Sequence, residues 1–125
     1  MSLNTLEEIA EYIVSDGKGI LAADESNPTC GKRFDSIGVE STETNRRDYR
    51  EMLFRAAGMQ DNIGGVILFD ETIRQSAEDG TPLVELIKTQ GALPGIKVDK
   101  GLAPLDSSPE ESVTQGLDGL DERCK

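Results

Sequence analysis

The amino-acid sequence predicts an α/β fold, the N-terminal part of a larger parallel structure made of about three strand–helix units. Short apolar runs without helical period alternate along the chain with segments whose apolar residues recur at helical spacing. Strands that alternate with helices pair in parallel through right-handed crossovers. A closed (β/α)8 barrel needs about 250 residues, and this chain has 125. We therefore expect the beginning of a barrel or of a doubly wound sheet.

The first third of the chain predicts a helix and then a strand. Thr5 and Glu8 form the pattern of a capping box. The apolar residues that follow at helical spacing are Leu6, Ile9, Ala10 and Ile13. Residues 20–23 are apolar without helical period and end at acidic Asp24, which is typical of a parallel strand buried on both faces. We expect a polar loop after this strand.

The remainder of the chain repeats the alternation twice. A second helix is predicted from an apolar stripe that ends at Gly58 and consists of Tyr49, Met52, Leu53, Ala56 and Ala57. A second strand follows at residues 66–69, and the pair Thr81-Pro82 is suited to begin a third helix. The third strand is predicted at residues 95–99. After it, the composition predicts a loop around residues 104–111 and then a helical tail over residues 114–125.

The charge balance and the two cysteines limit the class of protein. The chain has 13 Lys and Arg against 24 Asp and Glu, a formal net charge of −11. Nucleic acids and anionic membrane surfaces bind faces rich in Lys and Arg, so we expect neither as a partner. Cys30 and Cys124 lack the spacing of a disulfide framework, which indicates free thiols in an intracellular protein. Because no signal peptide or membrane span is recognisable, a cytoplasmic location is expected.

The third predicted strand carries the most informative charges. Ile96 and Val98 share one face, while Lys97 and Asp99 share the other, about 6–7 Å apart along the strand. Charges that face the inside of a sheet or barrel are costly unless they are paired or used. The pattern alone favours a structural ion pair and a functional lysine equally.

Asp24 is a second candidate, because it ends the first predicted strand on the face that carries Ile20 and Ala22. Barrel enzymes place catalytic groups at this carboxyl end of their strands. The alternative is that Asp24 or Ser26 caps a following helix, and the spacing by itself favours capping.

Two basic pairs, Lys32-Arg33 and Arg46-Arg47, stand out in an acidic chain. Either pair could bind a phosphate, since Arg offers a forked donor and Lys a point charge. The alternative, which pairs of this kind favour in general, is a set of surface salt bridges.

Six motifs, taken together and in order, resemble class I fructose-bisphosphate aldolase. They are GKGILAADES (residues 17–26), GKR (31–33), NRR followed by Tyr49-Arg50 (45–50), GGVILFDET (64–72), GIKVDKG (95–101) and TQGLDGL (114–120). The resemblance implies a TIM (β/α)8 barrel that cleaves fructose 1,6-bisphosphate reversibly, through a lysine Schiff base, into glycerone phosphate and glyceraldehyde 3-phosphate. It also implies that no metal or other cofactor takes part.

The resemblance carries roles to individual residues of this sequence. Asp24 matches the family's first-strand active-site aspartate, near the bond that breaks, and Lys97 matches the third-strand lysine, near a substrate phosphate. The residues that match the first loop, where the family approaches a phosphate, are Ser26, Thr29, Lys32 and Arg33. Arg46 matches a further arginine associated with substrate binding.

The resemblance further implies that residues 1–125 are the N-terminal portion of a single aldolase barrel domain, truncated before the fourth strand. The family's Schiff-base lysine belongs to the sixth strand, so we expect this fragment alone to be inactive. The family is typically homotetrameric, and we expect the same of the full-length protein with its sugar-phosphate substrate. The alternative is a non-catalytic fragment that acts only as a phosphate-binding or interaction module.

Overall fold

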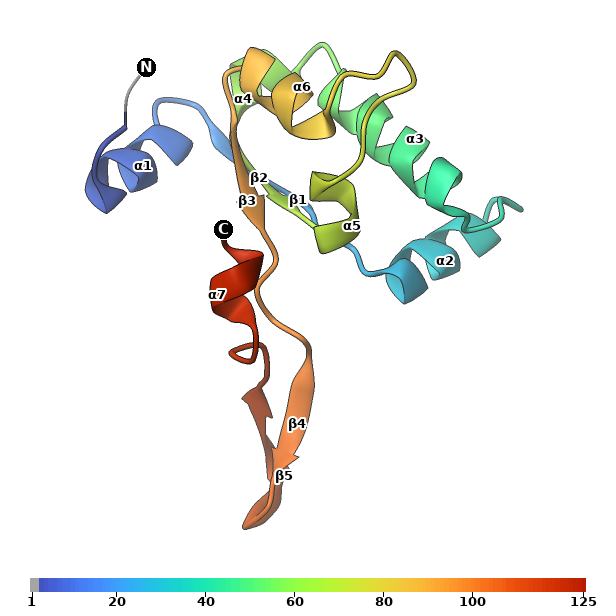
Figure 1. The fold of residues 1–125 in the computed structure, drawn as a ribbon, viewed down its shortest axis with the longest axis vertical. Coiled ribbons are helices and arrows are strands. Elements are labelled where there is room, and N and C mark those ends of the chain that lie inside the picture. Colours follow the sequence, from blue (N-terminus) through green and yellow to red (C-terminus); the bar gives the residue numbers. More distant parts are fainter. Residues whose placement is uncertain (1–2) are drawn as a thin grey trace.

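The structure, a computed structural model, describes residues 3–125 and confirms the α/β class. A three-stranded parallel sheet lies at the centre, helices flank it, and a two-stranded hairpin projects away from it (Figure 1). The elements in chain order are α1 (Leu6–Ile13), β1 (Gly19–Ala23), α2 (Asn27–Asp35), α3 (Glu43–Phe54), α4 (Met59–Asn62), β2 (Ile63–Leu68), α5 (Asp70–Ile73), α6 (Leu83–Thr89), β3 (Leu93–Ile96), β4 (Leu102–Leu105), β5 (Ser108–Thr114) and α7 (Leu120–Arg123).

The three parallel strands end level with one another. In the order β1-β2-β3, Ala23 is opposite Leu68, and Leu68 is opposite Ile96. The amide of Lys97 continues the ladder by donating to the Leu68 carbonyl at 2.8 Å. The residues that follow these strand ends, including Asp24 and Lys97, therefore emerge at one edge of the sheet.

The core lies on one face of the sheet, on the side of α3 and α6 (Figure 1). Its buried members are Ala23, Phe54, Met59, Val66, Leu68, Ala77, Leu83, Leu86, Ile87 and Ala92. The other face of β1 is open, since Ile20 is 52% exposed and Ala22 is also exposed. The expectation of a strand buried on both faces is therefore wrong for the described residues.

Helix α1 begins as predicted and lies at the amino ends of the strands. The Thr5 side chain accepts from the Glu8 amide, and the Glu8 carboxylate accepts from the Thr5 amide at 3.0 Å, so the capping box is confirmed. The Tyr12 hydroxyl donates to the carbonyl of Gly91, just before β3. This bond ties α1 to a part of the chain 79 residues away.

Helix α2 occupies the segment that was expected to be a polar loop. Its sequence, NPTCGKRFD, contains Pro and Gly, which hide a helix from composition-based reasoning. Pro28 lies in the first turn, where its missing N–H costs nothing. Cys30 and Phe34, four residues apart, form the buried face of the helix.

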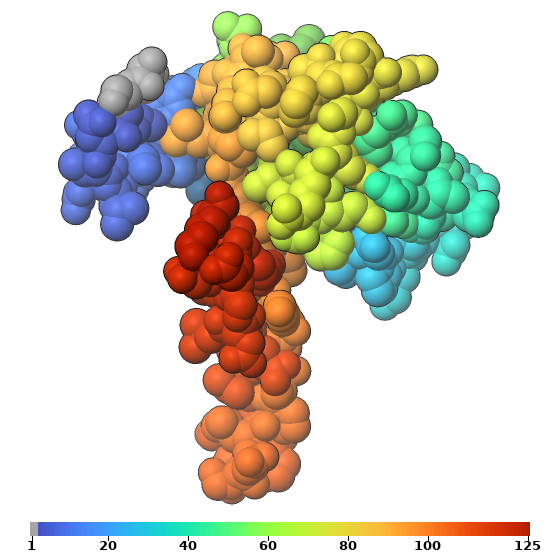
Figure 2. Space-filling view, in the orientation of Figure 1, coloured from blue at the N-terminus to red at the C-terminus, as the bar shows by residue number. Residues whose placement is uncertain are grey.

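A second correction concerns the segment after the third strand, predicted to be a loop and a long helical tail. Residues 102–114 form the antiparallel hairpin β4–β5, which extends as a narrow arm below the body of the molecule (Figure 2). The expected helix is limited to the single turn of α7. The hairpin lacks an alternating apolar pattern and includes Pro104 at a register shift, so its sequence gives no strand signal.

The boundaries of three other predicted elements also shift, and the first of these is the second strand, which spans Ile63–Leu68 and not residues 66–69. The second predicted helix, α3, ends at Phe54, so Ala56 and Ala57 lie outside it, and Met52 is 61% exposed. Arg50 and Phe54 supply its fully buried positions instead. The third strand ends at Ile96 and not at Asp99.

Both cysteines are free thiols, Cys30 buried and Cys124 exposed. Within residues 3–125, the structure has no helix of the length and apolar character that crossing a bilayer requires.

We predict that Gly64→Ala destabilises the protein. A Cβ atom at Gly64 would lie 2.8 Å from the Ile13 carbonyl carbon and closer still to its oxygen, so α1 would have to move away from β2. The expected loss in the free energy of unfolding is about 2 kcal/mol, the size typical of overpacking.

Gly31→Ala is the matched control, because a Cβ there is 3.9 Å from its nearest neighbour, Ser41, and the position is helical. Alanine should be neutral or slightly stabilising at that site. Thermal unfolding measures both variants, and equal midpoints for the two would contradict the packing of α1 described here.

Candidate functional site

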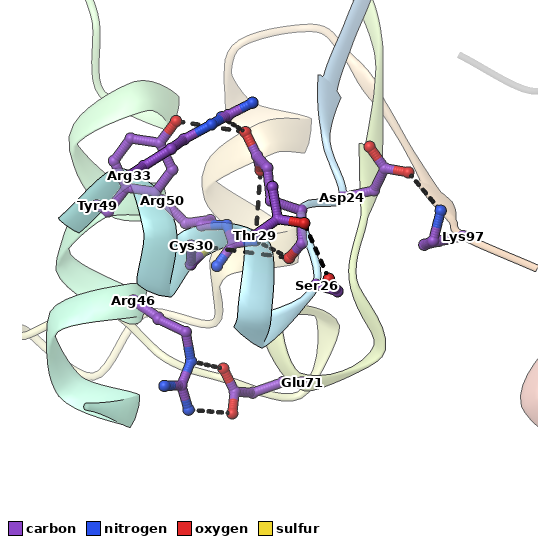
Figure 3. Close-up of polar contacts among 11 residues, drawn as sticks. Asp24, Ser26, Thr29, Cys30, Arg33, Arg46, Tyr49, Arg50, Glu71 and Lys97 are labelled. Carbon is purple, nitrogen blue, oxygen red and sulfur yellow. Dashed lines mark hydrogen bonds and ion pairs between the residues drawn. The ribbon is translucent and has the colours of Figure 1, made fainter. Parts of the chain in front are cut away.

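The candidate site is centred on a lysine held between two carboxylates. The Lys97 ammonium nitrogen lies 2.7 Å from Asp99 Oδ1 and 3.4 Å from Asp24 Oδ2. Lys97 follows β3 and Asp24 follows β1, so the level strand ends bring together two residues that are 73 positions apart (Figure 3). Lys97 and Asp99, which were predicted to share one face of a strand, meet through their side chains although β3 ends at Ile96. The charges therefore form an ion-pair cluster at the carboxyl-end edge of the parallel sheet, the edge at which barrel enzymes place their catalytic groups.

The Lys97 side chain remains charged in this setting. The hydrogen bond to Asp99 raises the pKa of Lys97 above its usual value, and Asp24 adds to this effect against a partial desolvation. Lys97 in turn lowers the pKa of Asp99. About a quarter of each of the Lys97 and Asp24 side chains is exposed, so both groups can reach a ligand.

A cleft of about 660 Å³ opens beside this cluster at the carboxyl ends of the strands. It is lined by Ser26, Phe69, Asp70, Arg74, Lys97, Asp99, Lys100, Gly101 and Arg123. Four cations and two carboxylates surround a volume that suits a small anionic molecule. Among residues 3–125, no three His, Cys, Asp or Glu side chains are grouped so that they could hold a metal ion.

Two hydroxyl groups lie together where the chain passes from β1 into α2, and one of them, that of Ser26, lines the cleft. Ser26 and Thr29 lie 3.1 Å apart through their side-chain oxygens. Ser26 is the N-cap residue of α2, yet its side chain makes no capping hydrogen bond. Because Asp24 pairs with Lys97 and lies outside the cap, helix capping does not explain Asp24.

The first basic pair lies on α2. Lys32 is exposed, and Arg33 forms an ion pair with Glu25 while its side chain stays 57% exposed. Glu25 also accepts from the Tyr49 hydroxyl at 3.4 Å. Arg33 thus forms the salt bridge that was its alternative interpretation, with much of its guanidinium still open to solvent.

The second basic pair is separate from the cluster around Lys97. Glu71 accepts from Nε and Nη2 of Arg46 at 2.8 and 2.9 Å (Figure 3). The Ser41 carbonyl accepts from Nη1 of Arg46. Arg46 is 8% exposed. The adjacent Arg47 pairs with Asp48. The structure therefore gives Arg46 a fixed partner that joins α3 to α5, away from the cleft.

Three basic residues of the cleft were not singled out from the sequence. Arg123 of α7 donates to the carbonyl oxygens of Lys97 at 2.7 Å and of Val98 at 3.1 Å. Arg74 and Lys100 complete the lining. No sequence pattern predicts that Arg123 lies next to Lys97, because this contact depends on the hairpin that returns the chain from Lys100 to α7.

Comparisons with known proteins agree on one family. Residues 5–125 match the family model described as fructose-bisphosphate aldolase class-I. A fructose-bisphosphate aldolase of Drosophila melanogaster is 59% identical over 95% of this chain and 33% of its own length. A probable class 1 aldolase of Xanthomonas axonopodis is 54% identical over the whole chain and 37% of its own length.

A solved structure gives the same result for the fold. The fructose-bisphosphate aldolase of Plasmodium falciparum, in complex with TRAP and a small-molecule inhibitor, superposes with a TM-score of 0.88 at 53% identity. The match covers 94% of this chain and 34% of that one. The chain thus spans about a third of the length of the relatives it matches, and its fold is that of an N-terminal part of a TIM barrel.

We predict that Glu71→Gln destabilises the protein at neutral pH by about 2 kcal/mol, because it leaves the buried Arg46 without a counter-charge. Arg46 lowers the pKa of Glu71 below its ordinary value of 4.5. A carboxylate with a lowered folded-state pKa stabilises the fold above its unfolded pKa, and this contribution is lost as the pH falls through the folded value.

Urea unfolding at a series of pH values measures this effect. The difference between wild type and Glu71→Gln should be full above pH 4.5 and shrink below it. Glu85→Gln is the control, since Glu85 pairs with Lys88 at the surface and both side chains are 53% exposed. A pH-independent difference would show that the charge pair is not its cause.

Proposed function

This chain belongs to the class I fructose-bisphosphate aldolase family, and we propose from that premise that its complete protein cleaves fructose 1,6-bisphosphate reversibly. The products are glycerone phosphate and glyceraldehyde 3-phosphate. The observation that carries the proposal to this chain is the meeting of Asp24 and Lys97 at the carboxyl ends of β1 and β3, the two strands that flank β2. Residues 1–125 then form the first part of a single barrel domain.

The proposed chemistry assigns the proton and the charge to particular groups. A lysine amine condenses with the substrate ketone, releases water and makes an iminium group that can accept electrons. When the carbon–carbon bond breaks, its electron pair moves toward the iminium nitrogen. The hydroxyl on the carbon that becomes the aldehyde loses its proton to a base. We assign the Asp24 carboxylate to this step at the reacting centre. Lys97 remains an ammonium group and is not the Schiff-base lysine.

A substrate phosphate is the second part of the proposal. Lys97 offers a charge held in place by Asp99, and the hydroxyl groups of Ser26 and Thr29 lie together at the start of α2. Lys32 and Arg33 project from the exposed face of α2 that follows. Phosphate binding by a point charge and several short donors is the arrangement that these groups support. Arg46 is the weakest member of the proposed set, since Glu71 already holds its guanidinium.

We also propose a homotetramer for the complete protein. The β4–β5 arm carries Leu102 at 71% and Val113 at 49% exposure, and Leu117 after it is 85% exposed. Apolar side chains on a projecting hairpin favour burial, against the rest of the complete protein or against another subunit. For the compartment we propose the cytoplasm; one of the relatives is a cytosolic enzyme of Arabidopsis thaliana, and another, of Chlamydomonas reinhardtii, is named chloroplastic.

We predict that the complete protein, mixed with fructose 1,6-bisphosphate and borohydride, is trapped as a covalent substrate adduct and loses activity. In the same protein, Asp24→Asn should lower kcat by about a hundredfold or more, with a much smaller change in KM, because the carboxylate acts at the reacting centre. Steady-state cleavage rates and mass spectrometry of the trapped enzyme measure the two effects.

Asp61→Asn is the matched control, because Asp61 is exposed on α4 before β2 and should leave kcat unchanged. Absence of the adduct in wild type would refute the Schiff-base mechanism. An unaltered kcat in Asp24→Asn would remove Asp24 from the reaction.

We predict that Arg33→Ala weakens binding through the phosphate alone. A lost charge-assisted contact corresponds to about 1.5–3 kcal/mol, so KM for the bisphosphate should rise roughly tenfold or more, while a non-phosphorylated sugar analogue is unaffected. Arg55→Ala is the control, since Arg55 pairs with Glu51 and Asp79. Equal losses with both substrates would exclude Arg33 as a phosphate ligand.

A further inference from the structure

Arg50 is the most deeply buried charged residue in the part of the chain that the structure describes. It lies on α3, its side chain is 0% exposed, and within residues 3–125 its Nε and Nη1 have no hydrogen-bond partner. The guanidinium carbon lies 5.6 Å from the centre of the Tyr49 ring, which adds a cation–π contact. The guanidinium is therefore confined, yet its donors are only partly used.

The donor of Arg50 that is used points at the residue after Asp24. Nη2 donates to the Glu25 carbonyl oxygen at 2.7 Å and approaches Glu25 Oε2 at 3.4 Å (Figure 3). The Cys30 thiol lies 3.9 Å from the same carbonyl, and the Cys30 amide donates to the next one, Ser26, at 2.9 Å. The peptide units Glu25–Ser26 and Ser26–Asn27 are thus held from α2 and α3.

The energetics do not favour an explanation by stability alone. A buried charge with incomplete hydrogen bonding has a high desolvation cost, and apolar replacements of similar volume are often neutral or stabilising. The ion pair with Glu25 is long, at 3.4 Å, and Glu25 already has Arg33 as a partner. What Arg50 supplies uniquely is the short bond to the Glu25 carbonyl.

We propose that Arg50 is a positioning residue for the reaction, which fixes the backbone after β1 so that Asp24 meets Lys97 and Ser26 lies at the cleft. This inference rests on the proposed function for its kinetic consequences. Asp24 lies outside regular secondary structure, since β1 ends at Ala23 and α2 begins at Asn27. The backbone of the three residues between them is held by the hydrogen bonds from Arg50 and Cys30 and by the ion pair of Glu25 with Arg33.

The kinetic test compares Arg50→Met with Arg55→Met in the complete protein. Met keeps much of the volume of the Arg50 side chain and removes its hydrogen-bond donors. Arg55 is the control because it lies at the end of the same helix and pairs with Glu51 and Asp79. We expect Arg50→Met to lower kcat roughly 10- to 100-fold, the loss typical of a slightly misplaced group. KM should change less than about threefold, and the thermal midpoint should stay within a few degrees of that of Arg55→Met.

A double variant distinguishes positioning from general damage. If Arg50 acts through Asp24, adding Arg50→Met to Asp24→Asn should lower kcat little further, because the group to be positioned is already gone. Losses that multiply in the double variant, or an unchanged kcat in Arg50→Met, would overturn the proposal. If Arg50→Met does not fold, Arg50→Lys takes its place: one ammonium cannot reproduce the planar fork, so kcat should fall several-fold, and a wild-type kcat would overturn the proposal.

A crystal structure of the same variant provides a test that does not depend on the reaction. In Arg50→Met, or in Arg50→Lys if Met does not fold, we expect the Glu25 carbonyl to turn and Lys97 Nζ to lie more than 4 Å from Asp24, against 3.4 Å here. An unchanged pair would overturn the positioning role. If wild type lacks aldolase activity but the pair separates in the variant, the proposed function fails while the role of Arg50 stands.

Discussion

The register of the parallel sheet determines the rest of this structure. Ala23, Leu68 and Ile96 lie opposite one another, so each strand releases its next residue at the same edge. The functional candidates Asp24 and Lys97 meet because of this register and because period-2 alternation turns both away from the core. A one-residue slip of β3 would send Lys97 toward the helices and replace it with an apolar side chain. The apolar core on the other face therefore fixes the geometry of the charges.

The acidic composition gives most cations of the chain a partner and leaves few of them open. Arg46 is held by Glu71, Arg47 by Asp48, and Arg55 by Glu51 and Asp79. In the cleft, Lys97 and Arg74 also have carboxylate partners, but four cations, the other two being Lys100 and Arg123, gather there with only two carboxylates in the lining. This local excess of cations contrasts with the formal net charge of −11 for the whole chain. Local arrangement, and not net charge, decides what such a protein can bind.

The sequence predicted those parts of the fold whose signals are local. The capping box at Thr5, the strand–helix alternation and the shared side of Lys97 and Asp99 all follow from patterns of a few residues. The hairpin, the helix α2 and the roles of Arg50 and Arg123 could not be predicted in this way. Arg50 lies between α2 and α3 only because a segment with Pro and Gly becomes helical, and Arg123 reaches Lys97 only after a 26-residue return of the chain. Such contacts are products of tertiary packing, which no local pattern encodes.

The two ends of the parallel sheet differ in the residue types that they carry: the amino ends pack against α1, and the carboxyl ends carry the charged cluster. At the amino ends, Gly64 and Gly65 allow the backbone and side chain of Ile13 to approach β2, and Tyr12 binds the Gly91 carbonyl. At the carboxyl ends, the strands are followed by Asp24, Phe69 and Lys97, all partly exposed and two of them charged. Between them, the open face with Ile20 and Ile67 borders an apolar cavity of about 550 Å³. A barrel needs such a face for its interior layers, whose packing supports the strands while chemistry is confined to their carboxyl ends. The open apolar face and the charges at the carboxyl ends of the strands are thus both consequences of the barrel architecture.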